Sequence, residues 1–299
     1  MSRPIDLPDY RRPAAPVAAR LARIRERPVV LEARGLGKTF DTPAGPVQAL
    51  TGIDLTIHRR EFVCVIGSSG CGKSTLIRLI AGLEEPTAGS ILLERREVHG
   101  PGPGRGMVFQ SYTLFPWLTV QGNVEFGLRM TGRTPAEAAE EASRWIGLVG
   151  LARFAGAYPS QLSGGMKQRV AIARALANEP RILLMDEPFG ALDAQTRCQM
   201  QGYLLEIWQN VEVTILFITH DLDEAVYLGD RIVVLDAQPG RVREVIEVPL
   251  TRPRVTDQFL DPYFLATRYH IEELIHSPDG RRPDVLAVRE SSALAQEVL

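Results

Sequence analysis

The pattern of apolar and polar positions predicts a chain of short β-strands separated by helices. Several short runs are apolar or alternate between apolar and polar residues, which is typical of strands: 29–33, 53–57, 62–66, 91–93 and 106–109. Two further runs, 181–187 and 213–218, have apolar interiors without alternation, as expected for parallel strands that are buried on both faces. The pattern therefore favours an α/β domain with a buried parallel sheet.

A helical texture replaces the strand pattern between Gln110 and Pro159. Its clearest helix covers 135–148. Four residues form the apolar side of this helix: Trp145, Ile146, Leu148 and Val149. Ser163 is placed to cap a further helix that runs to about Asn178. We expect these helices to form a subdomain, at about 111–178, that is inserted between strands.

The two ends differ from the body of the chain. Residues 1–28 are rich in proline and hold seven arginines, which favours a solvated extension. Val17, Leu21 and Ile24 have helical spacing, so a short amphipathic helix that docks on the body or on an anionic membrane is the alternative. We expect the main domain to cover 29–250. Beyond it, the pattern predicts a helical stretch at 256–275 and a polar tail over 276–299.

Composition narrows the functional classes. The chain has 299 residues, enough for one large domain with a subdomain or tails, and its formal net charge is only −2. This charge provides no global field for nucleic acid. No apolar run approaches the roughly eighteen residues that a membrane span needs, and residues 1–28 lack the apolar core of a secretory signal. The three cysteines are unpatterned, which argues against a disulfide framework or a zinc site and fits a reducing compartment.

Residues 67–75 read GSSGCGKST and fit the phosphate-binding pattern G-x-x-x-x-G-K-[ST]. They follow the apolar run 62–66 and open the helical pattern 76–80, so the context is strand, glycine loop and helix. The glycines let the backbone turn tightly and aim N–H groups inward, which makes a cradle for a polyphosphate. Lys73 adds a mobile positive charge for the outer phosphates, and the Ser74 hydroxyl is the expected protein ligand of Mg²⁺.

Polar side chains follow both apolar strands downstream of this loop. Asp186 and Glu187 end one strand, and His220 comes directly after the other. Since the carboxyl ends of parallel strands meet at one edge of a sheet, we expect these side chains near the phosphate loop. Asp186 is expected in the magnesium shell, Glu187 as the group that orients the attacking water and accepts its proton, and His220 at the γ-phosphate.

Two further features are candidates for nucleotide contacts. Ser163 and the glycines that follow it expose N–H groups at the start of a helix, which is a second anion site. Phe40 lies in a stretch, 38–43, whose composition resembles a loop, and its ring is suited either to stacking on a nucleotide base or to partial burial in the core.

The order of these motifs resembles that of an ATP-binding cassette (ABC) transporter ATPase, over about residues 29–248. The resemblance implies a P-loop NTPase fold: a RecA-like parallel sheet core, an antiparallel β subdomain and an inserted α-helical subdomain. It also implies hydrolysis of ATP with Mg²⁺. Residues 162–166 read LSGGM and are similar to the family signature, with Met166 in place of the usual glutamine.

The resemblance implies a role for each residue that matches a family motif. The implied nucleotide contacts are Phe40, Gly67, Ser68, Ser69, Gly70, Cys71, Gly72, Lys73, Ser74, Thr75, Ser163, Gly164, Gly165 and Asp193. The implied catalytic residues are Glu187, His220 and Gln110, and the implied magnesium ligands are Ser74, Gln110 and Asp186.

Geometry predicts that the working unit is a dimer. The helix after Gly165 has about thirteen residues, roughly 20 Å at 1.5 Å each, and leads from the signature back to the strand that bears Asp186. The signature therefore points away from its own phosphate loop. Two chains arranged head to tail would form two composite sites, each with the loop of one subunit and Ser163 and Gly165 of the other.

The remaining question is what the ATPase drives. Residues 111–118 carry large apolar side chains, including Trp117, which are suited either to a groove for a helix of a membrane subunit or to the core of the helical subdomain. Stretches from Leu114, Phe189 and Leu228 resemble the importers of nitrate, sulfonate, taurine and bicarbonate. We therefore expect a peripheral subunit on the cytoplasmic face of the inner membrane, with permease subunits and, indirectly, a solute-binding protein as partners and no nucleic acid. A soluble ABC ATPase that clamps nucleic acid or ribosomes is the alternative.

Overall fold

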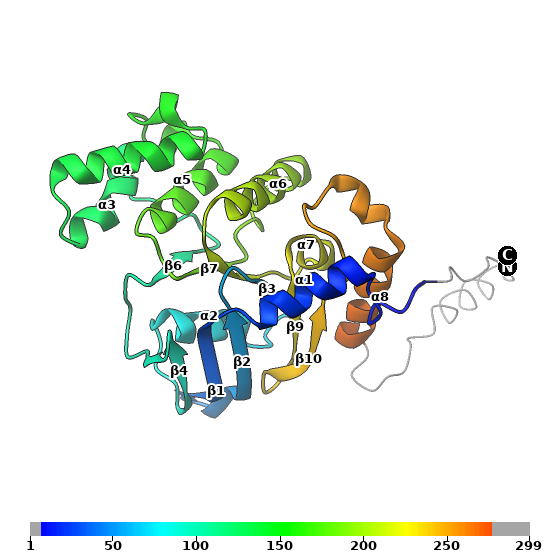
Figure 1. Cartoon of the computed structure of the whole chain (residues 1–299). Coiled ribbons are helices and arrows are strands. Elements are labelled where there is room, and N and C mark those ends of the chain that lie inside the picture. The colour runs from blue at the N-terminus through cyan, green and yellow to red at the C-terminus, as the bar shows by residue number, and fades with distance from the viewer. Residues whose placement is uncertain (1–6, 277–299) are drawn as a thin grey trace, which may run out of the picture.

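The computed structural model describes residues 7–276, which form two sheets and a group of helices on one side (Figure 1). The smaller sheet is antiparallel and has the strand order β2-β1-β4-β5. Its strands are β1 (Val29–Thr42), β2 (Gly45–His58), β4 (Ala88–Leu93) and β5 (Arg96–Glu97). This sheet is the antiparallel β subdomain that the family resemblance implies.

The larger sheet has the order β10-β9-β3-β8-β7-β6, and all of its pairs are parallel except β10 with β9. Its strands are β3 (Phe62–Gly67), β6 (Arg105–Val108), β7 (Ile182–Asp186), β8 (Thr214–Ile218), β9 (Arg231–Asp236) and β10 (Arg241–Glu247). Every residue of β3, β7 and β8 is buried, which explains why their sequences are apolar without alternation.

The two faces of the larger sheet belong to two separate cores. Val63 and Val65 of β3 lie in the core that contains α2 (Lys73–Ala81) and the antiparallel sheet. Phe62 and Cys64 of the same strand lie in the core on the opposite face, with the remaining helices. These helices include α5 (Gly164–Leu176), α6 (Ala194–Asn210), α7 (Leu222–Leu228) and α8 (Pro262–His276). The parallel sheet thus separates α2 from α5.

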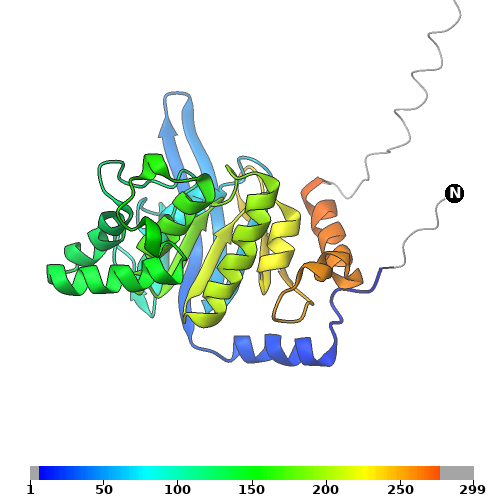
Figure 2. The ribbon, with the colours of Figure 1, turned by 90° about the horizontal axis from the view of Figure 1, so that it is seen from above.

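The predicted helical insertion is present as α3 (Val120–Met130), α4 (Pro135–Leu148) and α5, and it projects to one side of the sheets (Figure 2). Helix α4 begins with a capping box between Thr134 and Glu137. Of the predicted apolar side, Trp145, Ile146 and Val149 are buried. The prediction is wrong for Leu148, which is 52% exposed at the end of the helix.

The N-terminal segment is not a solvated extension where the structure describes it. Residues Ala15–Arg25 form α1, and Val17, Leu21 and Ile24 are all buried. The Arg20 guanidinium donates to the Asp230 carboxylate at 2.5 Å, which fixes the helix beside β9. The interpretation of a solvated tail is therefore wrong for α1, and docking on the body is the correct alternative. Arg25 donates to Glu247 at the end of β10, and Figure 2 shows α1 at the edge of the molecule.

The predicted C-terminal helical stretch is confirmed by the 3₁₀ turn Thr256–Leu260 and by α8. The start of the N-terminal extension, 1–6, and the predicted polar tail from 277 onwards lie outside the described residues. Within 7–276, no helix combines the length and the apolar character needed to cross a bilayer.

Substitution of Leu21 by alanine tests the docking of α1. Leu21→Ala removes a buried side chain, so we expect the free energy of unfolding to fall by about 2 to 4 kcal/mol. Denaturant unfolding followed by circular dichroism measures this change. Arg23→Ala on the exposed side of the same helix is the control and should change stability little. Equal effects of the two substitutions would contradict the docked position of α1.

Candidate nucleotide-binding site

The phosphate loop connects the end of β3 to the start of α2 and follows a path that requires glycine. Gly70 and Gly72 have φ values of 77° and 92°, in the left-handed region that side chains disfavour. Gly72 is the N-cap of α2, and the Leu76 N–H donates to its carbonyl at 2.8 Å. The first N–H groups of α2 therefore stand at the end of the loop as unpaired donors of the kind that bind phosphate.

Lys73 is buried against its own loop. Its ammonium donates to the Gly67 carbonyl at 2.8 Å and to the Ser68 carbonyl at 3.1 Å. Cys71 lies directly beneath it, with Sγ 3.9 Å from Lys73 Nζ, and burial raises the pKa of the Cys71 thiol. The thiol is therefore protonated at neutral pH and fills space in the loop.

Ser74 and Asp186 meet although they come from different elements. The Ser74 hydroxyl donates to Asp186 Oδ1 at 3.2 Å, which joins the first turn of α2 to the end of β7. Asp186 is only 9% exposed, and this burial raises its pKa despite the opposing hydrogen bond from Ser74. The Asp186 carboxylate and the Ser74 hydroxyl together offer two hard oxygen donors, and the buried carboxylate has no ion pair within the described residues. This combination suits Mg²⁺.

Glu187 and His220 form the next layer of the site. Nδ1 of His220 lies 3.0 Å from Glu187 Oε2. Glu187 has a φ of 43°, a strained conformation for a side chain of this size, and its N–H donates to the Ile218 carbonyl at 3.0 Å. Gln110 lies on the same side, because a Cβ built on Gly190 would stand 3.7 Å from Gln110 Nε2 and 4.0 Å from Glu187 Oε2. The carboxyl edge of the sheet therefore gathers the predicted catalytic side chains.

The signature residues lie on the other face of the sheet. Ser163 caps α5, and its hydroxyl accepts a hydrogen bond from the Met166 N–H at 3.4 Å. A Cβ on Gly165 would stand 2.9 Å from Thr196 Cγ2, so the signature adjoins the start of α6. Asp193 caps α6, and hydrogen bonds from the Thr196 side chain and then from the Thr196 N–H lower the pKa of Asp193. Ser163 and Asp193 thus neighbour each other, apart from the group around Lys73.

Phe40 is on a strand, so the loop predicted for 38–43 is wrong up to Thr42. It faces Val47 across the β1–β2 ladder, near the tip of a long hairpin. The ring is half-buried, and Lys38 Nζ lies 4.9 Å from its centre. Both predicted roles, stacking on a base and partial burial, remain compatible with this position.

Sequence reasoning missed two residues that shape the phosphate loop. A Cβ on Gly240, in the turn between β9 and β10, would stand 2.2 Å from the Cys71 carbonyl oxygen. A Cβ on Gly72 would stand 2.6 Å from Cδ2 of Leu50 on β2. The Thr51 N–H donates to the Gly240 carbonyl at 2.9 Å, which ties the two neighbours together. No local signal marks these residues, because the contacts join segments far apart in the chain.

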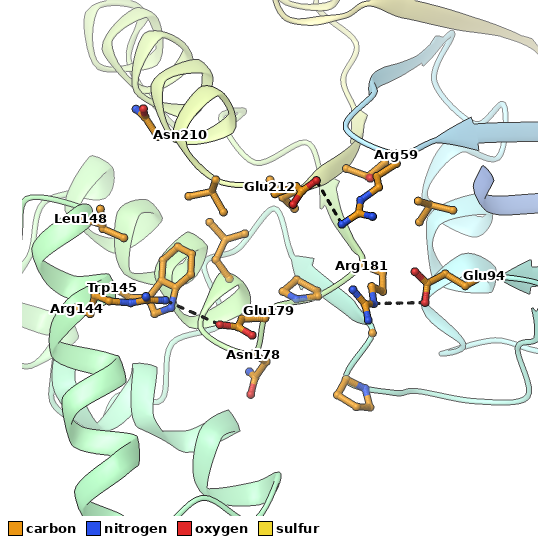
Figure 3. A pocket seen from close by; sticks show the side chains of 18 residues that line it. Arg59, Glu94, Arg144, Trp145, Leu148, Asn178, Glu179, Arg181, Asn210 and Glu212 are labelled. Carbon is orange, nitrogen blue, oxygen red and sulfur yellow. Dashed lines mark ion pairs between the residues drawn. The ribbon is translucent and has the colours of Figure 1, made fainter. Parts of the chain in front are cut away.

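A large pocket lies at the opposite end of the sheet from these residues. It has a volume of about 830 Å³ and opens at the amino ends of β7 and β8 (Figure 3). Its charged side chains are paired, for example Arg59 with Glu212 at 3.3 Å and Arg181 with Glu94 at 3.4 Å. Because its charges cancel locally and catalytic residues of parallel sheets gather at the carboxyl ends, this pocket is not the nucleotide site.

The fold and the site define a P-loop nucleotide-binding protein. Comparison with known proteins then identifies the family. The ABC transporter family profile matches residues 50–190. The chain is 53% identical to a nitrate import ATP-binding protein of Synechocystis over 74% of this chain and 83% of that protein. It is 44% identical to a taurine import ATP-binding protein of Pelagibacter ubique, over 82% of this chain and 94% of that protein.

A solved structure supports the same assignment. The dimeric post-hydrolysis structure of the ATP-binding cassette MJ0796, bound to ADP and Pi, matches with a TM-score of 0.64 at 32% identity, over 73% of this chain and 98% of that chain. The chain therefore belongs to the family of ABC transporter ATP-binding proteins.

Replacement of Gly240 tests the support of the phosphate loop. Gly240→Ala should push the Cys71 carbonyl away and weaken ATP binding by roughly tenfold, since overpacking costs about 1 to 3 kcal/mol. Isothermal titration with ATP measures the affinity. Gly202→Ala is the matched control, because a Cβ there meets nothing within 4 Å. Unchanged ATP affinity in Gly240→Ala would show that the loop does not depend on this contact.

Proposed function

We propose that this protein binds and hydrolyses ATP to energise an importer of a small anion. The observation that carries the proposal is the meeting of Ser74 and Asp186 beside the phosphate loop, with Glu187 and His220 next to them. This arrangement provides a cradle for the phosphates, oxygen ligands for a cation and a carboxylate for the attacking water.

The loop residues would hold the ATP phosphates. The N–H groups of the loop and of the first turn of α2 would cradle them. The Lys73 ammonium, which now bonds to two carbonyls of its own loop, would exchange these neutral acceptors for the charged outer phosphates. This exchange needs only a side-chain rotation, because Lys73 already lies within the loop.

Magnesium would be held by Ser74, Gln110 and Asp186. The buried Asp186 carboxylate fits this role because the cation would supply the missing positive charge. When bound, the ion neutralises charge on the phosphates during transfer. The protein's own part is to fix the two oxygens of Ser74 and Asp186 on rigid elements, α2 and β7.

Glu187 and His220 would act on the water and the γ-phosphate. The strained backbone of Glu187 aims its carboxylate at the site, where it can orient a water and accept its proton. His220 holds Glu187 Oε2 in the described state and would contact the γ-phosphate when ATP is bound.

The working unit is a dimer of ATPase subunits. The phosphate loop and the signature belong to opposite faces of one sheet, so Ser163, Gly164 and Gly165 would complete the site of the partner subunit. ATP would then hold the dimer closed, and loss of the γ-phosphate would let it open.

An exposed aromatic patch on the helical subdomain would bind the permease. We define it as Phe115, Trp117, Phe126 and Met130. Trp117 is 70% and Met130 71% exposed, and the Phe115 ring lies 5.5 Å from Trp117 and 4.6 Å from Phe126. Large side chains exposed as a group are typical of an interface, and an apolar surface of this kind suits an amphipathic helix.

Relatives that import nitrate and taurine support an anion as the transported solute. The protein would work on the cytoplasmic face of the inner membrane, and a solute-binding protein would deliver the anion to the permease. The alternative, a nucleic-acid or ribosome clamp, has no such support. Purification from native membranes tests the choice: a co-purifying membrane protein supports transport, and co-purifying nucleic acid would overturn it.

Glu187→Gln tests the catalytic site. The variant should keep ATP binding and lose turnover by at least about a hundredfold, because an amide cannot accept the proton of the water. Steady-state ATPase assays measure turnover, and size-exclusion chromatography with ATP should show a trapped dimer. Glu140→Gln, an exposed carboxylate on α4, is the control. Rapid hydrolysis by Glu187→Gln would remove Glu187 from its proposed role.

Trp117→Ala tests the permease surface. Because this side chain is largely exposed, the variant should fold and hydrolyse ATP normally in isolation. In complex with the co-purified membrane subunits, its transport-coupled ATPase activity should fall by about fivefold or more, as for a central interface residue. Phe154→Ala, an exposed aromatic outside the patch, is the control. Full coupling in Trp117→Ala would disprove the assignment of this surface.

A further inference from the structure

Arg174 on α5 is bonded to the backbone of the loop that follows Gln110. Its Nη1 donates to the Thr113 carbonyl at 2.9 Å, and its Nη2 donates to Thr113 Oγ1 at 3.0 Å and to the Tyr112 carbonyl at 3.5 Å. One guanidinium therefore binds two successive residues of the loop. Such hydrogen bonds from a charged donor are about twice as strong as neutral ones.

The loop is held in a conformation that it would not keep by itself. Thr113 has a φ of 48°, in the left-handed region that a β-branched residue disfavours. The three hydrogen bonds from Arg174 meet at and beside this residue, so the guanidinium offsets the strain. Without the guanidinium, the strain at Thr113 would lose this compensation, whereas the Phe115 backbone would keep its two hydrogen bonds with Asn123 of α3, at 2.8 and 3.1 Å.

The same guanidinium also contacts the aromatic patch. Its central carbon lies 5.5 Å from the centre of the Phe115 ring, which is within the range of a cation–π interaction. Phe115 in turn packs against Trp117 and Phe126. Arg174, which is part of the signature helix α5, thus contacts the surface that is proposed to bind the permease.

The opposite end of α5 carries the signature. Arg174 lies ten residues beyond Gly164, roughly 15 Å along a rigid helix. The loop also reaches back to the signature itself, because a Cβ on Gly164 would stand 3.1 Å from the Tyr112 hydroxyl. The loop is therefore bonded to α5 at Arg174 and lies close to α5 again at Gly164.

We infer that Arg174 is the positioning residue that makes the aromatic patch and the signature move as one body. The inference rests on the proposed function, in which the patch binds a permease and the signature serves the partner's ATP. A displacement of the patch is then transmitted through Arg174 to Ser163, and closure of the ATP dimer is transmitted the other way. Lysine can replace arginine here only in part, because it keeps the charge but lacks the planar fork that binds two acceptors while lying on a ring.

Distance measurements between spin labels in the full-length homodimer test this inference. The background is Cys198→Ser with Glu187→Gln, since Cys64 and Cys71 are buried and the second change traps the ATP state. Two variants are made, each with one spin label per subunit. The first carries the label at Trp117→Cys in the patch, and the second carries it at Ser160→Cys beside the signature. Pulsed EPR then gives the distribution of label-to-label distances with and without ATP.

With Arg174 intact, ATP should shift both distances to narrow distributions. In Arg174→Met, the distance at position 160 should still shift, and the distribution at position 117 should become about twofold broader because the loop loses its charged hydrogen bonds. Arg174→Lys should give an intermediate width. The control is Arg144→Met on α4: Arg144 also lies over a ring, 5.7 Å from Trp145, and bonds to Glu141, but it leaves the loop untouched.

The outcomes separate the two proposals. A distribution at position 117 that stays narrow in Arg174→Met, or that broadens equally in Arg144→Met, overturns the role of Arg174 alone. A distance at position 160 that does not respond to ATP with Arg174 intact overturns the proposed ATP dimer, and the inference with it.

Discussion

The close packing of the phosphate loop against strand β2 and the β9–β10 turn is the constraint on which the site depends. A loop that directs its N–H groups inward must have a left-handed backbone, and Gly70 and Gly72 supply it. Such a loop has few side chains of its own to hold its shape, so the surroundings must hold it. Leu50 and Gly240 do so by direct contact with Gly72 and Cys71. The positions of β2 and of the β9–β10 turn beside the loop therefore decide whether the loop is a phosphate cradle.

The parallel sheet brings the other proposed catalytic groups to this loop and keeps the signature away from it. The strands β7 and β8 end beside α2, which brings Asp186 to Ser74 and places His220 beside Glu187. The same sheet separates α2 from α5, because each helix packs into the core of a different face. A chain built in this way gathers the groups proposed for hydrolysis at one edge but leaves its signature on the other face. The dimer that we propose is therefore a consequence of sheet topology.

Local patterns were sufficient to predict most of the fold and the candidate site. Glycine spacing marked the phosphate loop, and apolar runs that end in polar residues marked β7 and β8, because burial on both faces leaves a clear signal. The errors came from tertiary contacts. The helix α1 has only three large apolar residues, and its docking involves Asp230, more than two hundred residues away. Residues 38–42 resemble a loop in composition, yet pairing with β2 makes them a strand.

The contacts that arginine side chains make in the helical subdomain could not be predicted from the sequence. Arg174 and Arg169 occur in one helix and both lie over an aromatic ring, Phe115 and Tyr203 respectively. Only the three-dimensional structure shows that Arg174 also donates hydrogen bonds to the strained turn at Thr113. A strained turn held by a charge from another helix keeps its shape only while that helix stays in place. The loop after Gln110 is therefore suited to follow the signature helix, so that chemistry at the sheet edge and movement at the surface remain linked.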